Sequence, residues 1–336
     1  MSFAKSISID RLNLVLLLLS AGVAVWIPFE LFLFSYAVLG PLHYLTEIGW
    51  LHQRRYFTQA KGDGWVLVAL GFIGVVLAVV LHLQGRDPKH ALLHTTLWYW
   101  TYHAFAVLAG FTVVAAAVFA LLPNAKRQLA LTLGGAGAVL GYAFLPAYGV
   151  FLLLLPTLIH VYLFTALFMW YGAIKSRSKL GYANAALMVV LGIWVCFLPE
   201  DFSRPALPQS LARLTETSFD RLPQMMGRIS GIVHGTLDAG QLLRLQRLVA
   251  FAYTYHYLNW FSKTRIIRWH EVSKTWIWIT LLVWLASVAL YAVDYRTGFV
   301  ALLLLSYLHV VLELPLNAVS IKGIFQAFRT RGSVQS

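Results

Sequence analysis

Two histidine–glutamate pairs with the same spacing stand in apolar segments of the chain. His43 is followed four residues later by Glu47, and His309 is followed four residues later by Glu313. Residues four apart share one face of a helix, one turn from each other. Ionisable side chains inside an apolar membrane segment are costly and face the protein interior or a polar cavity. The two pairs therefore predict a functional site.

Further histidines lie at the same depth in other apolar segments. Four of the five segments predicted to run inward across the membrane carry a histidine about 12 to 14 residues from the outer end, roughly 18–21 Å at the helical rise. These histidines are His43, His160, His256 and His309, and His103 joins them if its segment begins at His90. His52 and His270 lie near the inner ends of their segments, close to this level.

A layer of imidazoles at one depth predicts a metal centre. Neutral imidazole is the commonest protein ligand for zinc, copper and iron, and carboxylates beside several histidines favour iron, as one ion or two. Glu47 and Glu313 are the predicted catalytic carboxylates, which can bind the metal or orient the imidazoles. Haem held by two of the histidines stays an alternative. The predicted metal ligands are His43, His256, His309, His160, His103, His52 and His270.

The composition is that of a membrane protein. Of the 336 residues, 60% are hydrophobic and 12% are charged, and the mean hydropathy is +0.72. Such values are typical of polytopic membrane proteins. The net charge is +13, and the Lys and Arg residues lie in short loops between apolar runs. Membrane proteins carry basic loops for their topology and for contact with anionic lipid. Nucleic acid is therefore not a predicted partner. The single cysteine, Cys196, allows no intrachain disulfide.

The apolar runs predict an all-α, polytopic helical bundle with about ten transmembrane helices, each near the roughly 20 residues that a bilayer requires. With the N-terminus in the cytoplasm, most of the 26 Lys and Arg residues fall on the inner side, as the positive-inside rule demands. We therefore predict cytoplasmic N- and C-termini and a multi-pass protein of the bacterial inner membrane. The predicted spans are 12–28, 29–50, 64–83, 97–122, 128–145, 147–171, 183–199, 242–262, 275–293 and 297–319.

Residues 1–329 are predicted to form a single transmembrane domain, followed by a disordered tail over 330–336. The first apolar run lacks a small-residue cleavage site, so it is predicted to remain as a span. The long outer loop covers about 200–241, and within it 210–222 has the pattern of a short amphipathic helix at the membrane interface.

Two short motifs resemble the histidine-rich membrane iron oxygenases. The segment Gly40–Glu47, GPLHYLTE, stands where the bacterial membrane β-carotene-cleaving dioxygenases carry a Pro-His-Gly-Ala-Leu-Asp-like motif, and His234–Asp238, HGTLD, is similar to that motif in composition. The resemblance implies iron held by histidines, dioxygen as co-substrate, and an isoprenoid that enters from the lipid. Fatty-acid desaturases carry several histidine boxes, whereas this chain has the single match His90–His94 and no adjacent histidines.

The residues and the resemblance together predict a membrane-embedded, metal-dependent oxygenase or oxidase, with iron favoured. Its partners would be dioxygen, a lipid-soluble substrate such as an isoprenoid or fatty-acyl chain, and an electron-donor protein where the reaction needs one. The alternative is a proton or metal-ion transporter that uses the same buried histidines and glutamates; the lack of a clear internal repeat favours the enzyme. A third alternative is a structural subunit whose histidines only bond between helices.

Overall fold

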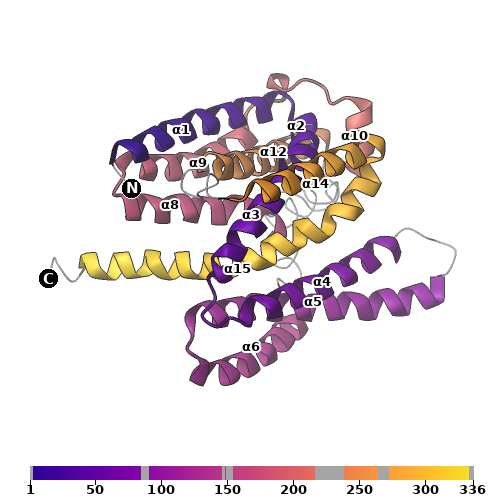
Figure 1. Ribbon diagram of the computed structural model, residues 1–336. Coiled ribbons are helices and arrows are strands. Elements are labelled where there is room, and N and C mark those ends of the chain that lie inside the picture. Colours follow the sequence, from indigo (N-terminus) through magenta and orange to yellow (C-terminus); the bar gives the residue numbers. More distant parts are fainter. Residues whose placement is uncertain are drawn as a thin grey trace. The chain divides into compact units, whose positions relative to one another are not determined.

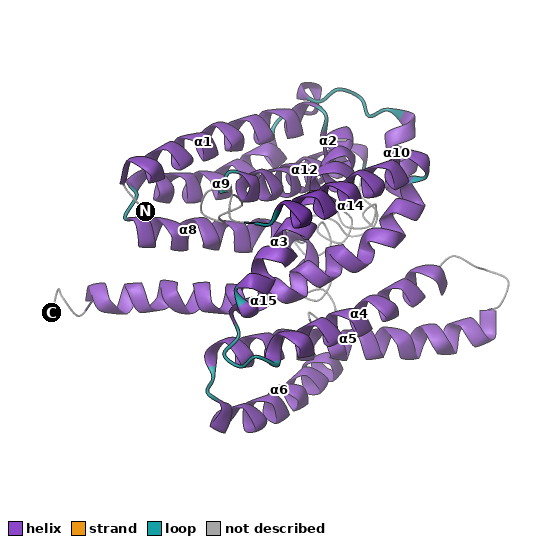
Figure 2. Cartoon of the chain, in the orientation of Figure 1, coloured by secondary structure: helices purple, strands orange, loops and turns teal. Residues whose placement is uncertain are grey.

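The structure is a computed structural model that describes residues 3–84, 91–145, 148, 154–215, 238–263 and 272–332. The regular elements in these ranges are all helices, and no strand occurs among them (Figure 1, Figure 2). The predicted all-α class is therefore confirmed. His90, His234 and His270 lie outside the described residues.

Eight helices among the described residues are long and apolar enough to cross a membrane. They correspond to all the predicted spans except 128–145 and 242–262. Those two segments are helical, as α6 (Asn124–Phe144) and α12 (Ala239–Phe261), but they are not among the eight. That α6 and α12 cross the membrane, and that both termini are cytoplasmic, stay predictions.

The distribution of polar and apolar side chains suits a lipid environment. Large apolar side chains face outward, among them Phe197 and Val293, which are 76% and 87% exposed. Polar side chains such as Asn13 and His43 are buried. A protein in water hides most of its large apolar side chains, whereas lipid solvates them and leaves polar groups to be satisfied inside the protein. The eight apolar helices therefore fit a multi-pass membrane protein.

The chain divides into two compact units, and the first contains Met1–Leu45, Leu158–Phe299 and Gly323–Ser336. Its central helix is α12, which packs against α1, α2 and α9 (Figure 1). Most residues of α12 are buried by these neighbours. Because α12 faces protein on nearly every side, it carries more polar residues than a lipid-facing helix tolerates, which accounts for its low hydropathy. The other helices of this unit are α1 (Phe3–Trp26), α2 (Pro28–Phe34), α8 (Thr165–Ser176), α9 (Lys179–Phe197), α10 (Pro208–Thr215) and α14 (Lys274–Val293).

The second unit contains Thr46–Thr157 and Val300–Lys322. Helix α5 (Ala91–Leu121) packs against α4 (Asp63–Gln84) and against α6 (Figure 1). Helix α3 (Gly40–Gln53), the π-helix Leu155–Phe164 and α15 (Tyr295–Gly332) each belong to both units along their length.

A buried ion pair joins α4 to α6 within the second unit. Arg127 Nη1 donates to Asp63 Oδ1 at 2.9 Å, and each side chain is 10% exposed. Arg127 Nε also donates to the carbonyl oxygen of Leu122 at 3.0 Å. The guanidinium therefore joins the start of α4 to the turn before α6.

Replacing Arg127 with methionine is expected to lower the free energy of unfolding by about 3–5 kcal/mol, because the Asp63 carboxylate stays buried without its partner. Chemical unfolding of the purified protein in detergent measures the change. Lys126→Met is the matched control, since Lys126 is exposed on the neighbouring position. Equal stabilities for the two variants would contradict the structural role given to the pair.

The turn between α14 and α15 is closed by Asp294. Its carboxylate accepts hydrogen bonds from the hydroxyl and, at 3.0 Å, from the backbone N–H of Thr297. These bonds hold the pKa of Asp294 below its usual value. The cap therefore stabilises α15 fully at pH values above the pKa that Asp294 has in the unfolded chain. This contribution is lost as the pH falls through the lower pKa that Asp294 has in the folded protein.

Two predicted features fall partly on described residues. Helix α10 covers the start of the amphipathic segment predicted over 210–222, and 216–237 lie outside the described residues. Helix α15 continues to Gly332, and 333–336 also lie outside the described residues.

Candidate metal centre

Two of the central histidines follow prolines that sit beside π-helical turns. The helix that begins as α2 passes through the π-turn Ser35–Leu39 before α3, where Pro41 precedes His43 by two residues. Pro156 lies within the π-helix Leu155–Phe164, which carries His160. A proline removes one backbone donor and crowds the preceding turn, and a π-turn relieves that crowding. The prolines thus change the direction in which each histidine points.

The third histidine comes from the buried helix α12. His256 Nε2 lies 3.0 Å from His43 Nε2, and the ring of His256 lies 4.8 Å from that of His160, centroid to centroid. Each of the three histidines offers a ring nitrogen within 4.8 Å of those of the other two. All three side chains are buried. The first unit therefore brings together His43, His160 and His256 from three separate helical segments.

The distance between the His43 and His256 nitrogens suits a single metal ion. Two nitrogens at 2.0–2.1 Å from one ion are about 2.9–3.4 Å apart at ligand angles between roughly 90° and 110°. The 3.0 Å between His43 Nε2 and His256 Nε2 falls in that range. Three protein ligands with a further position open are the usual arrangement of a catalytic metal site. The chemistry of the donor set and its geometry both fit a metal.

The orientation of His256 is fixed by a hydroxyl group from α8. Thr165 Oγ1 lies 2.7 Å from His256 Nδ1, and both side chains are buried. With Nδ1 held by Thr165, Nε2 is the nitrogen that faces His43. A ligating histidine generally bonds through its other nitrogen in this way, which fixes its tautomer and its ring.

Sequence reasoning missed Thr165. It lies five residues after His160, at the end of the π-helix, where the i→i+5 pattern replaces the usual helical repeat. With the α-helical repeat of 3.6 residues, His160 and Thr165 would point to different faces of the helix. With the π-helical i→i+5 pattern they lie about one turn apart.

Replacing Thr165 with valine is expected to weaken metal binding about 10- to 100-fold, the usual cost of losing a group that orients a ligand. Competition with a metal indicator measures the dissociation constant. Thr254→Val is the matched control: it removes the 2.8 Å hydrogen bond between Thr254 and Ser35, two positions before His256. Equal weakening in both variants would show that Thr165 acts only through general packing.

Aromatic side chains enclose His43. The rings of Tyr257 and Trp260 lie 5.1 and 5.5 Å from its ring, centroid to centroid. The hydroxyls of Tyr44 and Tyr257 are 2.8 Å apart, and both tyrosines are buried. A Cβ on Gly40 would lie 2.9 Å from the Tyr44 hydroxyl, so a glycine is needed there for the tyrosines to approach the helix. This wall keeps water from the face of His43 that it covers.

The remaining predicted residues lie in the second unit. His309 on α15 is buried, and its Nδ1 lies 3.2 Å from the carbonyl oxygen of Leu305. Glu47 and Glu313 are buried as well, each one helical turn after its histidine. That His309 is a ligand, and that the two glutamates are catalytic, stay predictions.

His52 and His103 have other surroundings. His52 is exposed, and its Nδ1 lies 2.9 Å from the Tyr56 hydroxyl. His103 is half-buried on α5, where it is hydrogen-bonded to Tyr142 and stacked edge-on against Tyr99. Neither belongs to the group of buried histidines whose ring nitrogens lie within 4.8 Å of one another. Their predicted role as ligands therefore gains no support from the described residues.

No protein-family model matches the chain, and searches of curated proteins and of solved structures found no match to it. The case for a function therefore rests on the residues and on their geometry.

Proposed function

We propose that this protein is a membrane-embedded oxidoreductase that holds a metal ion, with iron favoured, and oxidises a lipid-soluble substrate with dioxygen. The observation that carries the proposal is the convergence of His43, His160 and His256 in a buried shell between helical segments. Imidazoles that only bridge helices would each need a single partner. Three of them with converging nitrogens are better explained by a shared ligand.

Iron is favoured by the donors available along the same helices. Imidazole alone suits zinc, copper or iron, and added carboxylates shift the preference toward iron. Glu47 lies one turn of α3 after His43, so its carboxylate is close in sequence to that histidine. An iron ion bound there would supply the one-electron and dioxygen chemistry that protein side chains lack.

The roles of the surrounding residues follow from their contacts. The three histidines would hold the ion, and Thr165 would keep His256 in the tautomer that presents Nε2. The Tyr44–Tyr257 pair and Trp260 would shield the centre from water on the side of His43. A dry, shaped site strengthens the interactions inside it and prevents side reactions.

The apolar exterior supports a substrate that dissolves in lipid. A compound such as an isoprenoid or fatty-acyl chain concentrates in the bilayer, at the level where the predicted spans place the histidines. The resemblance of the segment Gly40–Glu47 to the β-carotene-cleaving dioxygenases supports the isoprenoid class. The same resemblance supports iron and dioxygen.

Two measurements on the purified protein test this function. Elemental analysis after growth in iron-supplemented medium should find about one or two irons per chain. An oxygen electrode should then record dioxygen consumption when an isoprenoid or a fatty acid is added to the iron-loaded protein with a chemical reductant. Bound iron without dioxygen consumption on any lipid would reject the oxidoreductase while leaving the metal centre in place.

Proton or metal-ion transport is the second candidate, and one contact favours it. The 3.0 Å between His43 Nε2 and His256 Nε2 is also the length of a hydrogen bond, through which one imidazole can pass a proton to another. Reconstitution in liposomes separates the two functions. Proton or metal flux across the bilayer, with no metal retained in the purified protein, would support transport.

A further inference from the structure

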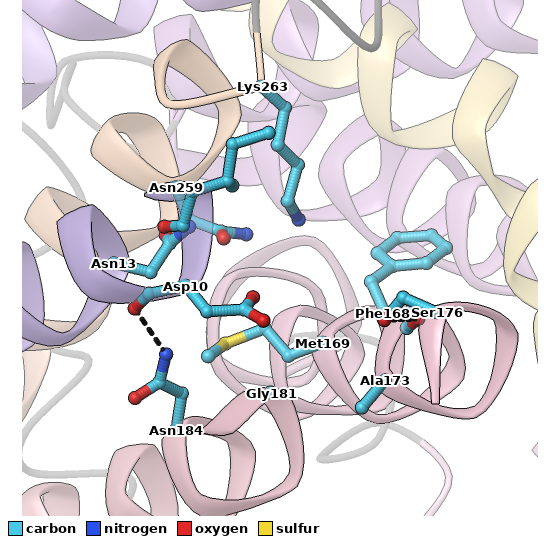
Figure 3. Close-up of a pocket in the computed structure, with 12 residues that line it drawn as sticks. Asp10, Asn13, Phe168, Met169, Ala173, Ser176, Gly181, Asn184, Asn259 and Lys263 are labelled. Atoms are coloured by element: carbon cyan, nitrogen blue, oxygen red, sulfur yellow. Dashed lines mark hydrogen bonds between the residues drawn. The ribbon is translucent and has the colours of Figure 1, made fainter. Parts of the chain in front are cut away.

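A partly open cavity lies at one end of a group of helices in the first unit (Figure 3). Its volume is about 90 Å³, and its walls come from α1, α8, α9 and the end of α12. Three of these helices belong to segments able to span a membrane, and the cavity lies where those segments start or stop: Ile9–Trp26, Leu155–Ser176 and Lys179–Phe197. The ends of spanning helices lie near the lipid headgroups. The position of the cavity therefore matches the headgroup level of a bilayer.

Charged groups of both signs enter this cavity. Figure 3 shows the side chains of Asp10, on α1, and Lys263, just after α12, pointing into the same space. Asp10 is held in place from α9, because its Oδ2 accepts a hydrogen bond from the Ser178 hydroxyl and its main-chain oxygen accepts one from the Asn184 amide at 2.7 Å. A fixed carboxylate and a lysine ammonium in one cavity suit a ligand that carries both a cation and an anion.

Asn259 brings a buried amide to the cavity wall. It is 6% exposed, and in the part of the chain that the structure describes its side-chain oxygen has no hydrogen-bond donor. Leaving a buried carbonyl oxygen without a donor is costly. A primary ammonium carries several N–H donors, enough to serve both this oxygen and the Asp10 carboxylate.

Much of the remaining wall is apolar. Ile9, Phe168 and Met169 contribute side chains to it, and Gly172 lies beside them on α8. Phe168 is half-buried and Gly172 is exposed, so along α8 the cavity reaches the outer face of a helix that can span the membrane. Apolar walls that meet the lipid favour a ligand with an apolar part of its own over a soluble zwitterion.

We propose that this cavity binds a phospholipid whose headgroup carries a primary ammonium, as in phosphatidylethanolamine. The ammonium donates to Asp10 and Asn259, and Lys263 holds the phosphate. The glycerol and acyl chains leave along α8 beside Phe168 and Gly172. Lysine is a usual ligand of phosphate, and basic pockets between membrane helices bind lipid headgroups. The inference goes beyond the proposed function, because a lipid bound here neither supplies nor needs the metal.

Native mass spectrometry of the purified protein, titrated with single lipids in detergent, tests the two ends of the headgroup separately. The wild type should bind phosphatidylethanolamine at least about tenfold more tightly than phosphatidylcholine, whose trimethylated ammonium has no N–H to donate. Asp10→Asn should bring phosphatidylethanolamine down to the affinity of phosphatidylcholine and leave phosphatidylcholine unchanged. Lys263→Met should weaken both lipids by a similar factor, because both carry the phosphate.

Asp201→Asn and Lys274→Met are the matched controls, since both residues are exposed and neither lines the cavity. Both variants should bind the two lipids as the wild type does. Equal affinity of the wild type for phosphatidylethanolamine and phosphatidylcholine would overturn the proposal. A Lys263→Met variant that binds both lipids as tightly as the wild type would overturn it too, because the lysine would then only reach toward the membrane surface.

Gly172→Leu closes the cavity without removing a polar group or the Asp10–Ser178 bond. A Cβ built on Gly172 meets nothing within 4 Å, so the larger side chain has room in the cavity that Gly172 lines. This variant should bind phosphatidylethanolamine at least about tenfold more weakly. Gly22→Leu, at an exposed glycine on α1 with equally open space, should not. Unchanged binding in Gly172→Leu would place the lipid elsewhere and overturn the proposal.

Free phosphoethanolamine separates a lipid from a soluble ligand with the same headgroup. It should fail to displace phosphatidylethanolamine at equal concentration, since it lacks the apolar part. Displacement at equal concentration would overturn the assignment to a lipid. All these affinities are measured on metal-free protein, so a failure to find iron would count against the proposed function and leave this inference standing.

Discussion

Replacing His43 or His256 with alanine is expected to reduce metal binding by more than about 100-fold, so that the purified variants carry almost no metal. The two ring nitrogens lie 3.0 Å apart and belong to different helices, so each variant removes one proposed ligand and leaves the other in place. Losing a group that only orients a ligand already costs 10- to 100-fold. Losing the ligand itself should cost more. His160→Ala should behave in the same way.

Elemental analysis of the wild type and the variants, purified in parallel, measures this effect. His52→Ala is the matched control, because His52 is exposed and is hydrogen-bonded to Tyr56. It should retain the metal of the wild type. Full metal content in both His43→Ala and His256→Ala would refute a centre built on these residues, provided that circular dichroism shows both variants to be folded.

His309→Ala in the same series decides a prediction made from the sequence alone. Loss of metal to the level of His43→Ala would make His309 a fourth ligand. A full metal content would limit the centre to the histidines of the first unit. Glu47→Gln and Glu313→Gln extend the comparison: a carboxylate that binds the ion should lower the metal content, and one that acts only in the reaction should lower dioxygen consumption alone.

Hydropathy predicted the eight helices that are long and apolar enough to cross a membrane, because lipid contact requires apolar side chains on every exposed face. The signal was weakest for α12, where protein rather than lipid surrounds the helix and polar residues are tolerated. The aromatic and polar run from Tyr253 to Asn259 is buried almost completely. Sequence periodicity cannot tell such a helix from a surface helix in water, because both mix polar and apolar residues.

The sequence predicts a common depth for the histidines, which stays a prediction, but it does not predict the direction in which they point. Counting residues from the end of a span gives the height of His43, His160 and His256, since the rise of a helix is constant. The direction of a side chain depends on the number of residues per helical turn. The π-helical segments Ser35–Leu39 and Leu155–Phe164 depart from the 3.6-residue repeat of the α-helix. For the same reason Thr165 could not be matched to His256 before the structure was known.

A cavity of about 90 Å³ among four helices of the first unit was also beyond the reach of sequence reasoning (Figure 3). It is lined by residues from α1, α8, α9 and α12, which are far apart in the chain. Asn259 lies three residues after His256 on α12, but nothing in the sequence places Asn184 or Asp10 beside it. Long-range packing of four helices decides which polar residues share a space.

Arg247→Met is expected to lower the free energy of unfolding by about 3 kcal/mol or more, because three hydrogen bonds from a buried charged guanidinium are lost, each contributing about 1.5–3 kcal/mol. Arg247 on α12 is fully buried. Its guanidinium donates to the Leu198 and Pro199 carbonyl oxygens at 2.7 and 2.8 Å, and to the Ser203 hydroxyl at 2.9 Å. The side chain thus ties the segment after α9 to α12.

Arg244→Met, one turn earlier on the same helix, is the matched control. Arg244 forms a 3.5 Å ion pair with Glu200 in which both side chains are about half exposed. Exposed pairs of this kind contribute at most about 1 kcal/mol. Unfolding by denaturant in detergent should therefore separate two arginine variants that sequence alone would treat as equivalent.

The Arg247 contacts also bear on the proposed metal centre. Arg247 and His256 both lie on α12. The hydrogen bonds of Arg247 restrict sliding and rotation of this helix, and they therefore also hold the imidazole of His256 in position. Arg247→Met should accordingly bind metal more weakly than Arg244→Met, even at temperatures where both variants are folded. If the two variants unfold at the same denaturant concentration and bind metal equally, Arg247 does not position α12. The geometry of His256 would then have to be set by Thr165 and by the packing of α1, α2 and α9.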